Sequence, residues 1–596
     1  MNIATRLGAP AWRWLAVIVI AVAVGQFTQR GLSSYGNFVA GTIAVAAIAA
    51  VGLNLLVGNA GLVSLATPAF MAIGAYGAGI VLQHSPLGIT GAVLIPIAIA
   101  TVVGGVVGLL ALRLRGFYLG LATLGLLEAT QYVLQQGGSL VGSGYGFPMP
   151  AVGSITAAQW SGIAASVLVV VVAIAASIRR SAVGRGLALL RQHETVAGCA
   201  GMNVVRLKVG VFAVSAGLGA LAGVLYGFVQ GAVSPDQFNL TLAVSQLAYI
   251  VFGGLGTVAG AVIGSIVLLV LPEVFHGLGQ NEGILNAAVL LGVLILAPQG
   301  MFPLVDKYAR RLFGRFRRRE PTRAVAVTAP VGAPTTPSTG TPIRFNDVTV
   351  RYGGVVAVNA FSATVRRGTV HGLIGPNGAG KSSAVGALFG LVRLAGGEIE
   401  VDGRTVQTSG RRNPPWTVAA AGIGRTFQTP HAGEGLTALE AVQNGVFRGV
   451  PHGLVRAGLR TSAVLAGEVE ARDRALTALD LVRFPVSAAT PVTELTLGEL
   501  RRVELARVLA GDPDVIVLDE PTSGMELADA DALFELLNGL AHDGGRSVLV
   551  VEHNVKLIFG YSDDVTVMNL GEVIASGTPA DIRADELVRG AYLGAR

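Results

Sequence analysis

The stretch that decides the fold of the C-terminal half is Gly375-Pro376-Asn377-Gly378-Ala379-Gly380-Lys381-Ser382. It fits the pattern GxxxxGK[ST] without a gap, and it lies between an apolar, strand-like run at 370–374 and a run compatible with a helix. Glycines let the backbone close around a phosphate group, and N–H groups at the start of a helix point toward an anion. A chance glycine-rich turn would lack this context. The stretch therefore predicts a phosphate-binding loop in an α/β domain.

Several positions of this loop have expected roles in holding a nucleotide. Lys381 is expected to reach the β- and γ-phosphates, and the Ser382 hydroxyl is expected to ligate Mg²⁺. ATP and Mg²⁺ are therefore the expected cofactors. The candidate nucleotide-binding residues of the loop are Gly375, Asn377, Gly378, Gly380, Lys381, Ser382 and Ser383.

A second motif, Val515-Ile516-Val517-Leu518-Asp519-Glu520-Pro521, is an apolar strand that ends in two carboxylates. Asp519 is expected to hold Mg²⁺ through water. Glu520, one residue further on, points in a different direction and is suited to polarise an attacking water. A strand that merely ends in a polar turn becomes a poor alternative once the chain also carries a phosphate loop.

Four more motifs accompany these two in the C-terminal half. They are Gly424-Arg425-Thr426-Phe427-Gln428, Leu495-Thr496-Leu497-Gly498-Glu499, Val551-Glu552-His553, and Tyr352 within Arg351-Tyr352-Gly353-Gly354.

Taken in their order along residues 343–596, the six elements resemble those of the nucleotide-binding domains of ABC transporters. The resemblance implies two cassettes that close head to tail on two ATP molecules, each ATP lying between one phosphate loop and the other cassette's signature motif. It makes Glu520 the general base, Gln428 a sensor and ligand of Mg²⁺, and His553 a contact of the γ-phosphate. It also implies that Tyr352 stacks on adenine, and that the signature residues Thr496 and Gly498 face the partner's ATP.

The signature motif departs from the LSGGQ pattern of that family. Leu497 replaces a glycine and Glu499 a glutamine, whereas Thr496 keeps a hydroxyl group. The resemblance places these residues at the partner's ATP, so the changes concern that opposite site. The catalytic set of this chain's own site is intact. The sequence therefore predicts ATP hydrolysis, and the departures are confined to the part that this chain contributes to the opposite site.

Composition assigns the N-terminal half to a membrane. The chain is 52% hydrophobic, and only 13% of its residues are charged, about half of the ~25% typical of soluble domains. These values exclude an ordinary cytosolic enzyme and a disordered protein. The single cysteine, Cys199, excludes an intramolecular disulfide and a multi-cysteine metal site, and is expected to be a small packed residue.

Apolar runs long enough to span a bilayer, about 20 residues each, recur through residues 1–306. The run at 240–271 is interrupted by glycines and is interpreted as two short segments, which brings the expected total to about ten. The runs lie near 13–28, 36–57, 61–83, 88–112, 117–136, 158–178, 207–231, 240–271 and 283–298.

Basic residues between these runs predict the orientation. Net charge is +5 in residues 1–306, +7 in 307–323 and −5 in 343–596, so the basic excess lies beside apolar runs and not on the soluble half. This distribution is typical of cytoplasmic loops, and it argues against nucleic-acid binding. It predicts a multi-pass protein of the cytoplasmic (inner) membrane with the N-terminus and the ATPase domain in the cytoplasm. Residues 307–342 are expected to form a basic and then Pro/Thr-rich linker.

The membrane half resembles the permeases of branched-chain amino acid importers. The resemblance rests on Gly52–Leu65, Leu112–Tyr118, Thr123–Gly125 and Arg191–Glu194, and the C-terminal Ala591-Tyr592-Leu593-Gly594 is similar to the ATPases of the same group. The chain departs from the permease pattern at Leu62 and at Ala66-Thr67, where the family usually has Gln and Gly-His.

Two features of the membrane half are candidates for function. Glu128 lies inside an apolar run, where an ionisable residue either serves the solute path or pairs with another helix. Asn54, Ser64 and Thr67 are interpreted mainly as packing residues. The polar segment 194–201 resembles the importer coupling helix that docks on the cassette, against the alternative of a solvated basic loop.

The expected fold is a polytopic α-helical membrane domain (1–306), then the linker, then an α/β P-loop NTPase domain of ABC type with a helical subdomain (343–596). The expected function is ATP-driven import of branched-chain amino acids or a related small polar solute by a permease–ATPase half-transporter. The resemblance implies a second permease, a second ATP-binding subunit and an extracytoplasmic solute-binding protein as partners, and it favours a heteromer over a homodimer. An ABC exporter and a membrane-tethered regulatory ATPase are the alternatives.

Overall fold

The computed structural model describes residues 9–114, 116–141, 146–275, 292, 295, 300–302, 343–450 and 453–593. These residues divide into two compact units. The first unit takes those within Met1–Leu187, Val205–Thr322 and Gly453–Val464, and the second takes those within Ala188–Val204, Arg323–His452 and Leu465–Arg596. Residues 188–204 and 453–464 each belong to the unit opposite to the one that their place in the chain predicts, and the limits 1–306 and 343–596 stay a prediction.

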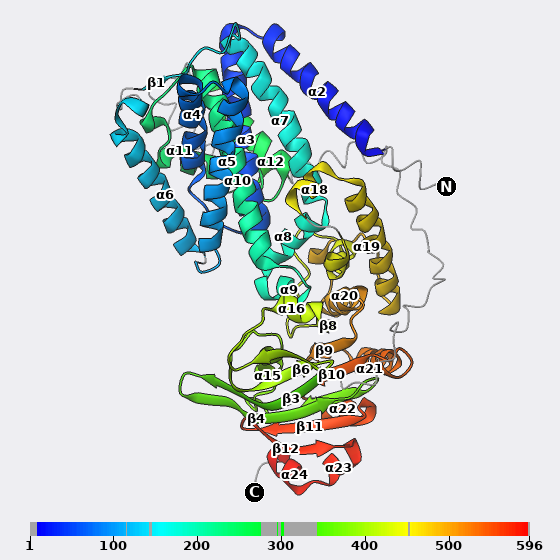
Figure 1. Ribbon diagram of the computed structural model, residues 1–596. Coiled ribbons are helices and arrows are strands. Elements are labelled where there is room, and N and C mark those ends of the chain that lie inside the picture. The colour runs from blue at the N-terminus through cyan, green and yellow to red at the C-terminus, as the bar shows by residue number, and fades with distance from the viewer. Residues whose placement is uncertain are drawn as a thin grey trace. The chain divides into compact units, whose positions relative to one another are not determined.

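The first unit consists mainly of long apolar helices (Figure 1). Two short strands, β1 (Phe147–Pro148) and β2 (Ala232–Val233), come from the connections between these helices and pair antiparallel. The short helix α18 (Leu454–Leu459) packs in this unit, where the Trp14 indole N–H donates to the Leu459 carbonyl at 3.0 Å. The long helices are α2 (Ala9–Gly31), α3 (Ser34–Asn54), α4 (Thr67–His84), α5 (Gly88–Leu110), α6 (Phe117–Gln136), α7 (Ala157–Arg179), α10 (Val204–Gln230), α11 (Leu240–Gly253) and α12 (Val258–Phe275).

Six of the described helices are long and apolar enough to cross a membrane, and the number is seven if a bent pair counts as one span. The bent pair confirms that the run at 240–271 forms two helices, which meet at an angle of 118° beside the glycines. The apolar run at 61–83 forms α4, which falls outside these candidate spans. The run at 283–298 lies outside the described residues, apart from 292 and 295, so the total of about ten segments stays a prediction.

The glycine break between α11 and α12 is held by a buried asparagine of α3. Asn54 donates from Nδ2 to the Thr257 carbonyl at 2.9 Å and accepts at Oδ1 from the Gly256 N–H, also at 2.9 Å. Backbone groups freed by a broken helix at membrane depth need such partners, because lipid offers none. Asn54 therefore acts as a packing residue, as its type and setting predicted.

The second unit contains two sheets around one core. The six-stranded sheet has the order β12-β11-β5-β10-β9-β8, with only β12 antiparallel to its neighbour, and the four-stranded sheet β4-β3-β6-β7 is antiparallel. One hydrophobic cluster joins residues of both sheets with helix α15 (Lys381–Leu388). The strands are β3 (Ile343–Tyr352), β4 (Val355–Val365), β5 (Val370–Ile374), β6 (Leu394–Val401), β7 (Arg404–Thr408), β8 (Ile423–Arg425), β9 (Val515–Asp519), β10 (Ser547–Val551), β11 (Asp564–Asn569) and β12 (Glu572–Gly577).

Helices between β8 and β9 form the helical subdomain that was expected of this fold class. They are α17 (Ala438–Gln443), α19 (Ser462–Leu481) and α20 (Leu497–Ala510), whereas α18, which also lies between β8 and β9 in the chain, packs in the first unit. The remaining helices are α8 (Ala182–Gln192), which passes from the first unit into the second, and α9 (Glu194–Cys199), α16 (Pro415–Ala420), α21 (Leu527–His542), α22 (Val555–Tyr561), α23 (Pro579–Ala584) and α24 (Glu586–Leu593).

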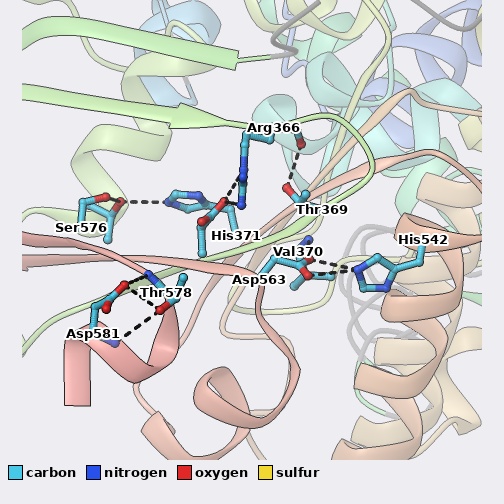
Figure 2. Close-up of polar contacts among 11 residues, drawn as sticks. Arg366, Thr369, Val370, His371, His542, Asp563, Ser576, Thr578 and Asp581 are labelled. Carbon is cyan, nitrogen blue, oxygen red and sulfur yellow. Dashed lines mark hydrogen bonds and ion pairs between the residues drawn. The ribbon is translucent and has the colours of Figure 1, made fainter. Parts of the chain in front are cut away.

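A polar network holds the start of β5 against β11 (Figure 2). The buried His371 contacts the Thr566 hydroxyl through Nε2 at 2.9 Å, and Thr566 in turn contacts Ser576 at 3.1 Å. Arg366 donates from Nε to Asp564 at 2.7 Å. Burial lowers the pKa of His371 to about 4, so this imidazole is neutral in the folded chain and has a structural role.

This pKa predicts a loss of stability in mild acid. The ordinary pKa of histidine is 6.5, and the pKa of His371 in the folded chain is about 4. Between these two pH values the unfolded chain binds a proton at His371 that the folded chain does not. The free energy of unfolding therefore decreases by about 1.4 kcal/mol for each unit by which the pH is lowered in this range. Thermal unfolding of the detergent-solubilised chain at pH 7 and pH 5 measures the effect. His371→Gln is expected to show a smaller acid shift than the wild type, and an equal shift in both would contradict the assignment.

Candidate nucleotide site

The phosphate loop has the strand–loop–helix setting that its sequence predicted. It follows the fully buried strand β5 and ends where α15 begins at Lys381. Gly380 adopts φ +98°, and a Cβ there would lie 2.4 Å from the Ala357 carbonyl oxygen, so only glycine fits. Asn377 and Gly378 are exposed along the loop, and Ser382 is exposed at the helix start.

Lys381 is folded back onto its own loop. Its side chain is buried, and Nζ donates to the carbonyls of Gly375 at 2.7 Å and Pro376 at 3.0 Å. Burial lowers the pKa of Lys381, and the carboxylates of Glu520 and Asp519 oppose that shift. The positive charge of Lys381 is therefore stabilised by Asp519, the last residue of β9, and by Glu520, which follows it.

Asp519 is held by an arginine that sequence reasoning did not assign to the site. Arg425 donates from Nη2 to Asp519 Oδ2 at 3.0 Å, and both side chains are buried. The guanidinium also lies over the rings of Phe389 and Phe427, at 5.2 and 4.9 Å from their centroids. The position of Arg425 inside a motif that already ended in a site residue was the available clue.

Glu520 lies in a strained backbone conformation beside Gln428. Its φ is +48°, a left-handed value that costs a non-glycine residue about 1–3 kcal/mol and that is concentrated at functional sites. Its backbone N–H donates to the Val551 carbonyl at 2.9 Å. The Gln428 amide donates from Nε2 to Glu520 Oε2 at 2.8 Å, so the structure brings together two residues that are 92 positions apart.

His553 lies at the end of β10, and its side chain is 59% exposed. Its neighbour Glu552 is fully buried and was quoted in the motif without a role. Glu552 accepts hydrogen bonds from the Thr522 N–H at 3.0 Å and from the His553 N–H at 3.1 Å. Glu552 thus links the segment after Glu520 to His553, the predicted contact of the γ-phosphate.

The other predicted nucleotide contacts lie on separate elements. Tyr352 is half-exposed at the end of β3. Thr496 is the N-cap of α20: its hydroxyl donates to Glu499 Oε2 at 2.9 Å, and the same carboxylate accepts from the Thr496 N–H at 2.8 Å. The glutamate that replaces glutamine at position 499 therefore has a structural role, because it completes a capping box at the start of α20.

The predicted coupling segment packs within the second unit. The buried Cys199 of α9 belongs to the core cluster that joins the two sheets, and burial raises the pKa of its thiol to about 12. The Gly433 N–H donates to Gln192 Oε1 at 2.8 Å, and the rings of His193 and His431 stack at 3.8 Å. Burial, followed by the nearby His193 and Arg507, lowers the pKa of His431 to about 4.

Known proteins match both halves of the chain. Residues 37–298 match the family described as "Branched-chain amino acid transport system / permease component", residues 358–523 match "ABC transporter", and residues 572–596 match "Branched-chain amino acid ATP-binding cassette transporter".

The relatives align with the second half. The "High-affinity branched-chain amino acid transport ATP-binding protein LivG" of Salmonella typhimurium (strain LT2) is 34% identical over 42% of this chain and 97% of its own length. BraF of Pseudomonas aeruginosa, with the same description, is 33% identical over the same shares. Among solved structures, a nucleotide-free ATP-binding cassette from an ABC transporter matches 43% of this chain and all of its own, with 25% identity and a TM-score of 0.37.

The fold and the site define an ABC-type ATPase, whose hydrolysis of ATP is coupled to transport, fused to a polytopic membrane unit. The chain belongs to the branched-chain amino acid ABC transporter family and joins its permease to its ATP-binding cassette in one polypeptide.

The buried pair of Arg425 and Asp519 yields a stability prediction. Arg425→Met leaves the Asp519 carboxylate buried without its charge partner, and removal of one partner from a buried pair costs about 3–5 kcal/mol. The unfolding temperature of the purified chain is therefore expected to fall. The double variant Arg425→Met/Asp519→Asn removes both charges and is expected to recover part of the loss, whereas a double variant no more stable than Arg425→Met would contradict the pairing.

Proposed function

We propose that this chain is one half of an ATP-driven importer for branched-chain amino acids or a related small polar solute. The observation that carries the proposal is the packing of residues 188–204, which contain the predicted coupling segment 194–201. These residues come from the permease part of the chain, and they pack with the cassette residues that follow Gln428. Such packing supports transmission of nucleotide-driven movement to a permease. The permease-family match and the branched-chain descriptions of the ATP-binding relatives support the solute class.

The proposed orientation puts the N-terminus and the cassette in the cytoplasm. Basic residues cluster in the loops on that side, including Arg113, Arg115, Arg179 and Arg180. A solute-binding protein would then deliver the solute to the opposite, extracytoplasmic face.

The proposed chemistry uses the residues that meet at the ends of β5, β9 and β10. Lys381 and the loop N–H groups bind the phosphates, Glu520 polarises the attacking water, and His553 contacts the γ-phosphate. Tyr352 stacks on the adenine. The Gln428 amide donates to Glu520 Oε2 at 2.8 Å, which supports a shared role at the reacting phosphate.

The residues present also fit Mg²⁺. Hydroxyl, amide and carboxylate oxygens are the hard ligands that this cation prefers, and Ser382, Gln428 and Asp519 supply one of each. When bound, Mg²⁺ would neutralise charge on the phosphates. Because Arg425 already occupies one oxygen of Asp519, the other oxygen is the one proposed to face the cation's water shell.

The catalytic proposal predicts the behaviour of Glu520→Gln. This variant is expected to bind ATP as the wild type does, because the phosphate contacts remain, and to lose steady-state hydrolysis at least a hundredfold, because the amide cannot act as a base. ATP binding and ATP hydrolysis are measured on the purified variant and on the wild type. Uptake of labelled leucine, urea and benzoate is measured in cells that lack the native chain and express either form.

Each outcome of that experiment separates one reading from another. Leucine uptake restored by wild type and not by Glu520→Gln supports the importer. Loss of a different solute replaces the substrate and keeps the transporter. Near-normal hydrolysis by Glu520→Gln would contradict the assignment of the base, and unaltered uptake of all solutes in cells without the chain would favour export or a regulatory ATPase.

The proposed assembly contains a second, different permease that covers one side of α6. Glu128 is exposed on that helix, eleven residues after Phe117 and eight before Gln136, which is about 12 Å from the nearer end. A carboxylate at that depth costs about 2.5–3.5 kcal/mol when it faces lipid. Gly125 and Ala129 on the same exposed side are small residues that allow a neighbouring helix to approach closely.

Charge favours a different chain over a second copy at this surface. A two-fold contact through α6 would bring two Glu128 carboxylates together in a medium of low dielectric constant, where like charges are strongly disfavoured. A partner helix with a hydrogen-bond donor would satisfy Glu128. The second ATP-binding subunit would then accompany that permease and complete the pair of ATP sites.

Photo-crosslinking in native membranes tests this assembly. A benzophenone amino acid in place of Tyr132, which is 65% exposed on the same side of α6, is expected to join the chain to a permease of different sequence. The matched control, Val102 on α5, is 66% exposed and is expected to give no such product. Glu128→Leu is expected to lower the yield more than Glu128→Gln, and a product of two identical chains, or none, would contradict the proposal.

A further inference from the structure

Three charged side chains of the signature helix α20 hold the backbone of the loop that carries Gln428. Arg501 donates from Nη1 to the Phe427 carbonyl at 2.6 Å and from Nη2 to the Gln428 carbonyl. Glu504 Oε1 accepts from the Phe427 N–H at 3.0 Å, and Arg507 donates to the His431 carbonyl. The loop is thus bound at both of its ends by one helix.

These side chains form one buried cluster. Arg501, Glu504 and Arg507 are 7%, 2% and 4% exposed, and their spacing of three residues puts them on one side of α20. Glu504 lies between the two guanidinium groups, 3.3 Å from Arg507 Nη2 and 3.9 Å from Arg501 Nη1. Burial raises the pKa of Glu504 to about 7, against the opposing effects of Arg507, the Phe427 N–H and Arg501.

The bonds of this cluster suggest more than a stabilising role. A buried ion cluster is often no more stable than apolar residues of the same volume, so charge by itself does not explain its presence. Here the two arginines direct guanidinium bonds at loop carbonyls, and Glu504 accepts a loop N–H. The cluster therefore fixes the path of a loop, which an apolar cluster could not do.

The loop connects two parts of the ATP machinery. On one side the Gln428 side chain reaches Glu520 at 2.8 Å. On the other side the cluster begins two residues after Glu499, within two turns of the capped start of the helix. A cavity of about 430 Å³, bordered by Arg501, Glu504, Met525 and α21, lies beside α20. This side of α20 therefore borders open space as well as packed side chains.

We propose that Glu504, between Arg501 and Arg507, is a positioning residue that locks the Gln428 loop to α20. Movement of Gln428 at this chain's own ATP site then shifts the signature motif that the chain presents to the other site. The inference rests on the proposed roles of Gln428 and of the signature motif, and it adds the physical link between them. Glu504 touches neither nucleotide nor metal, and it acts through the Phe427 backbone.

The test compares Glu504→Leu with Glu504→Gln in the assembled transporter in lipid nanodiscs. Glu504→Leu removes the acceptor of the Phe427 N–H, so kcat for ATP is expected to fall at least tenfold and the Mg²⁺ concentration for half-maximal rate to rise severalfold. Affinity for a fluorescent ATP analogue, measured without Mg²⁺, is expected to stay within twofold. Glu504→Gln keeps a carbonyl acceptor and is expected to recover most of the rate.

A control on the same helix isolates the loop contact. Arg502 pairs with Asp529 at 2.7 Å on the exposed side of α20 and does not reach the loop, so Asp529→Asn is expected to leave both parameters unchanged. A wild-type kcat and Mg²⁺ dependence in folded Glu504→Leu would overturn the proposal. If Glu504→Leu does not fold, Glu504→Gln decides, because a rate as low as that of Glu520→Gln would show that the acceptor is not what matters. Retained hydrolysis in Glu520→Gln, by contrast, would overturn the proposed base and leave this link standing.

Discussion

The parallel pairing of β10 with β5 and β9 is the constraint on which the ATP site depends. The pairing aligns Val551 with both Leu373 and Asp519, so the three strands end side by side. Everything that follows a strand end is thereby delivered to one edge of the sheet, as ligand sites of α/β sheets generally are. The phosphate loop, Glu520 and His553 need no further device to come near one another, because the strands that precede them are locked in register by buried apolar residues.

Buried charge at this edge is compensated locally, each time by a different partner. Asp519 has Arg425, Glu552 has backbone N–H groups and the Thr522 hydroxyl, and Glu504 has two arginines. An ionised group removed from water is costly unless it is paired or hydrogen-bonded, so these contacts limit how each carboxylate can be oriented. Orientation is what the chemistry requires, since a base must lie within hydrogen-bonding reach of its water.

Polar groups in the membrane unit also find hydrogen-bond partners within the protein, because little water is available there. Asn54 satisfies the broken backbone beside Gly256, and the Thr123 hydroxyl accepts from the Leu65 N–H at 2.9 Å while donating to the Gly120 carbonyl at 2.8 Å. Glu128 makes no such contact among the residues that the structure describes. The contrast separates polar residues that hold the permease together from Glu128, for which we propose a partner in a second permease.

The sequence by itself determined the local structure and the order of the motifs. The phosphate loop is a glycine-rich turn between a buried strand and a helix, and β9 is an unbroken apolar run, so neighbouring residues sufficed to predict both. The apolar runs likewise predicted the long helices, α4 among them, although α4 is not one of the candidate spans. Only the tertiary structure decided the pairings that complete the site, such as Arg425 with Asp519, Gln428 with Glu520 and His193 with His431. It also assigned residues 188–204 and 453–464 to units other than those predicted from their positions in the chain. The physical reason is range: helices, turns and caps depend on residues a few positions apart, whereas these contacts join residues 92 to 238 positions apart, which only strand register and helix packing bring together.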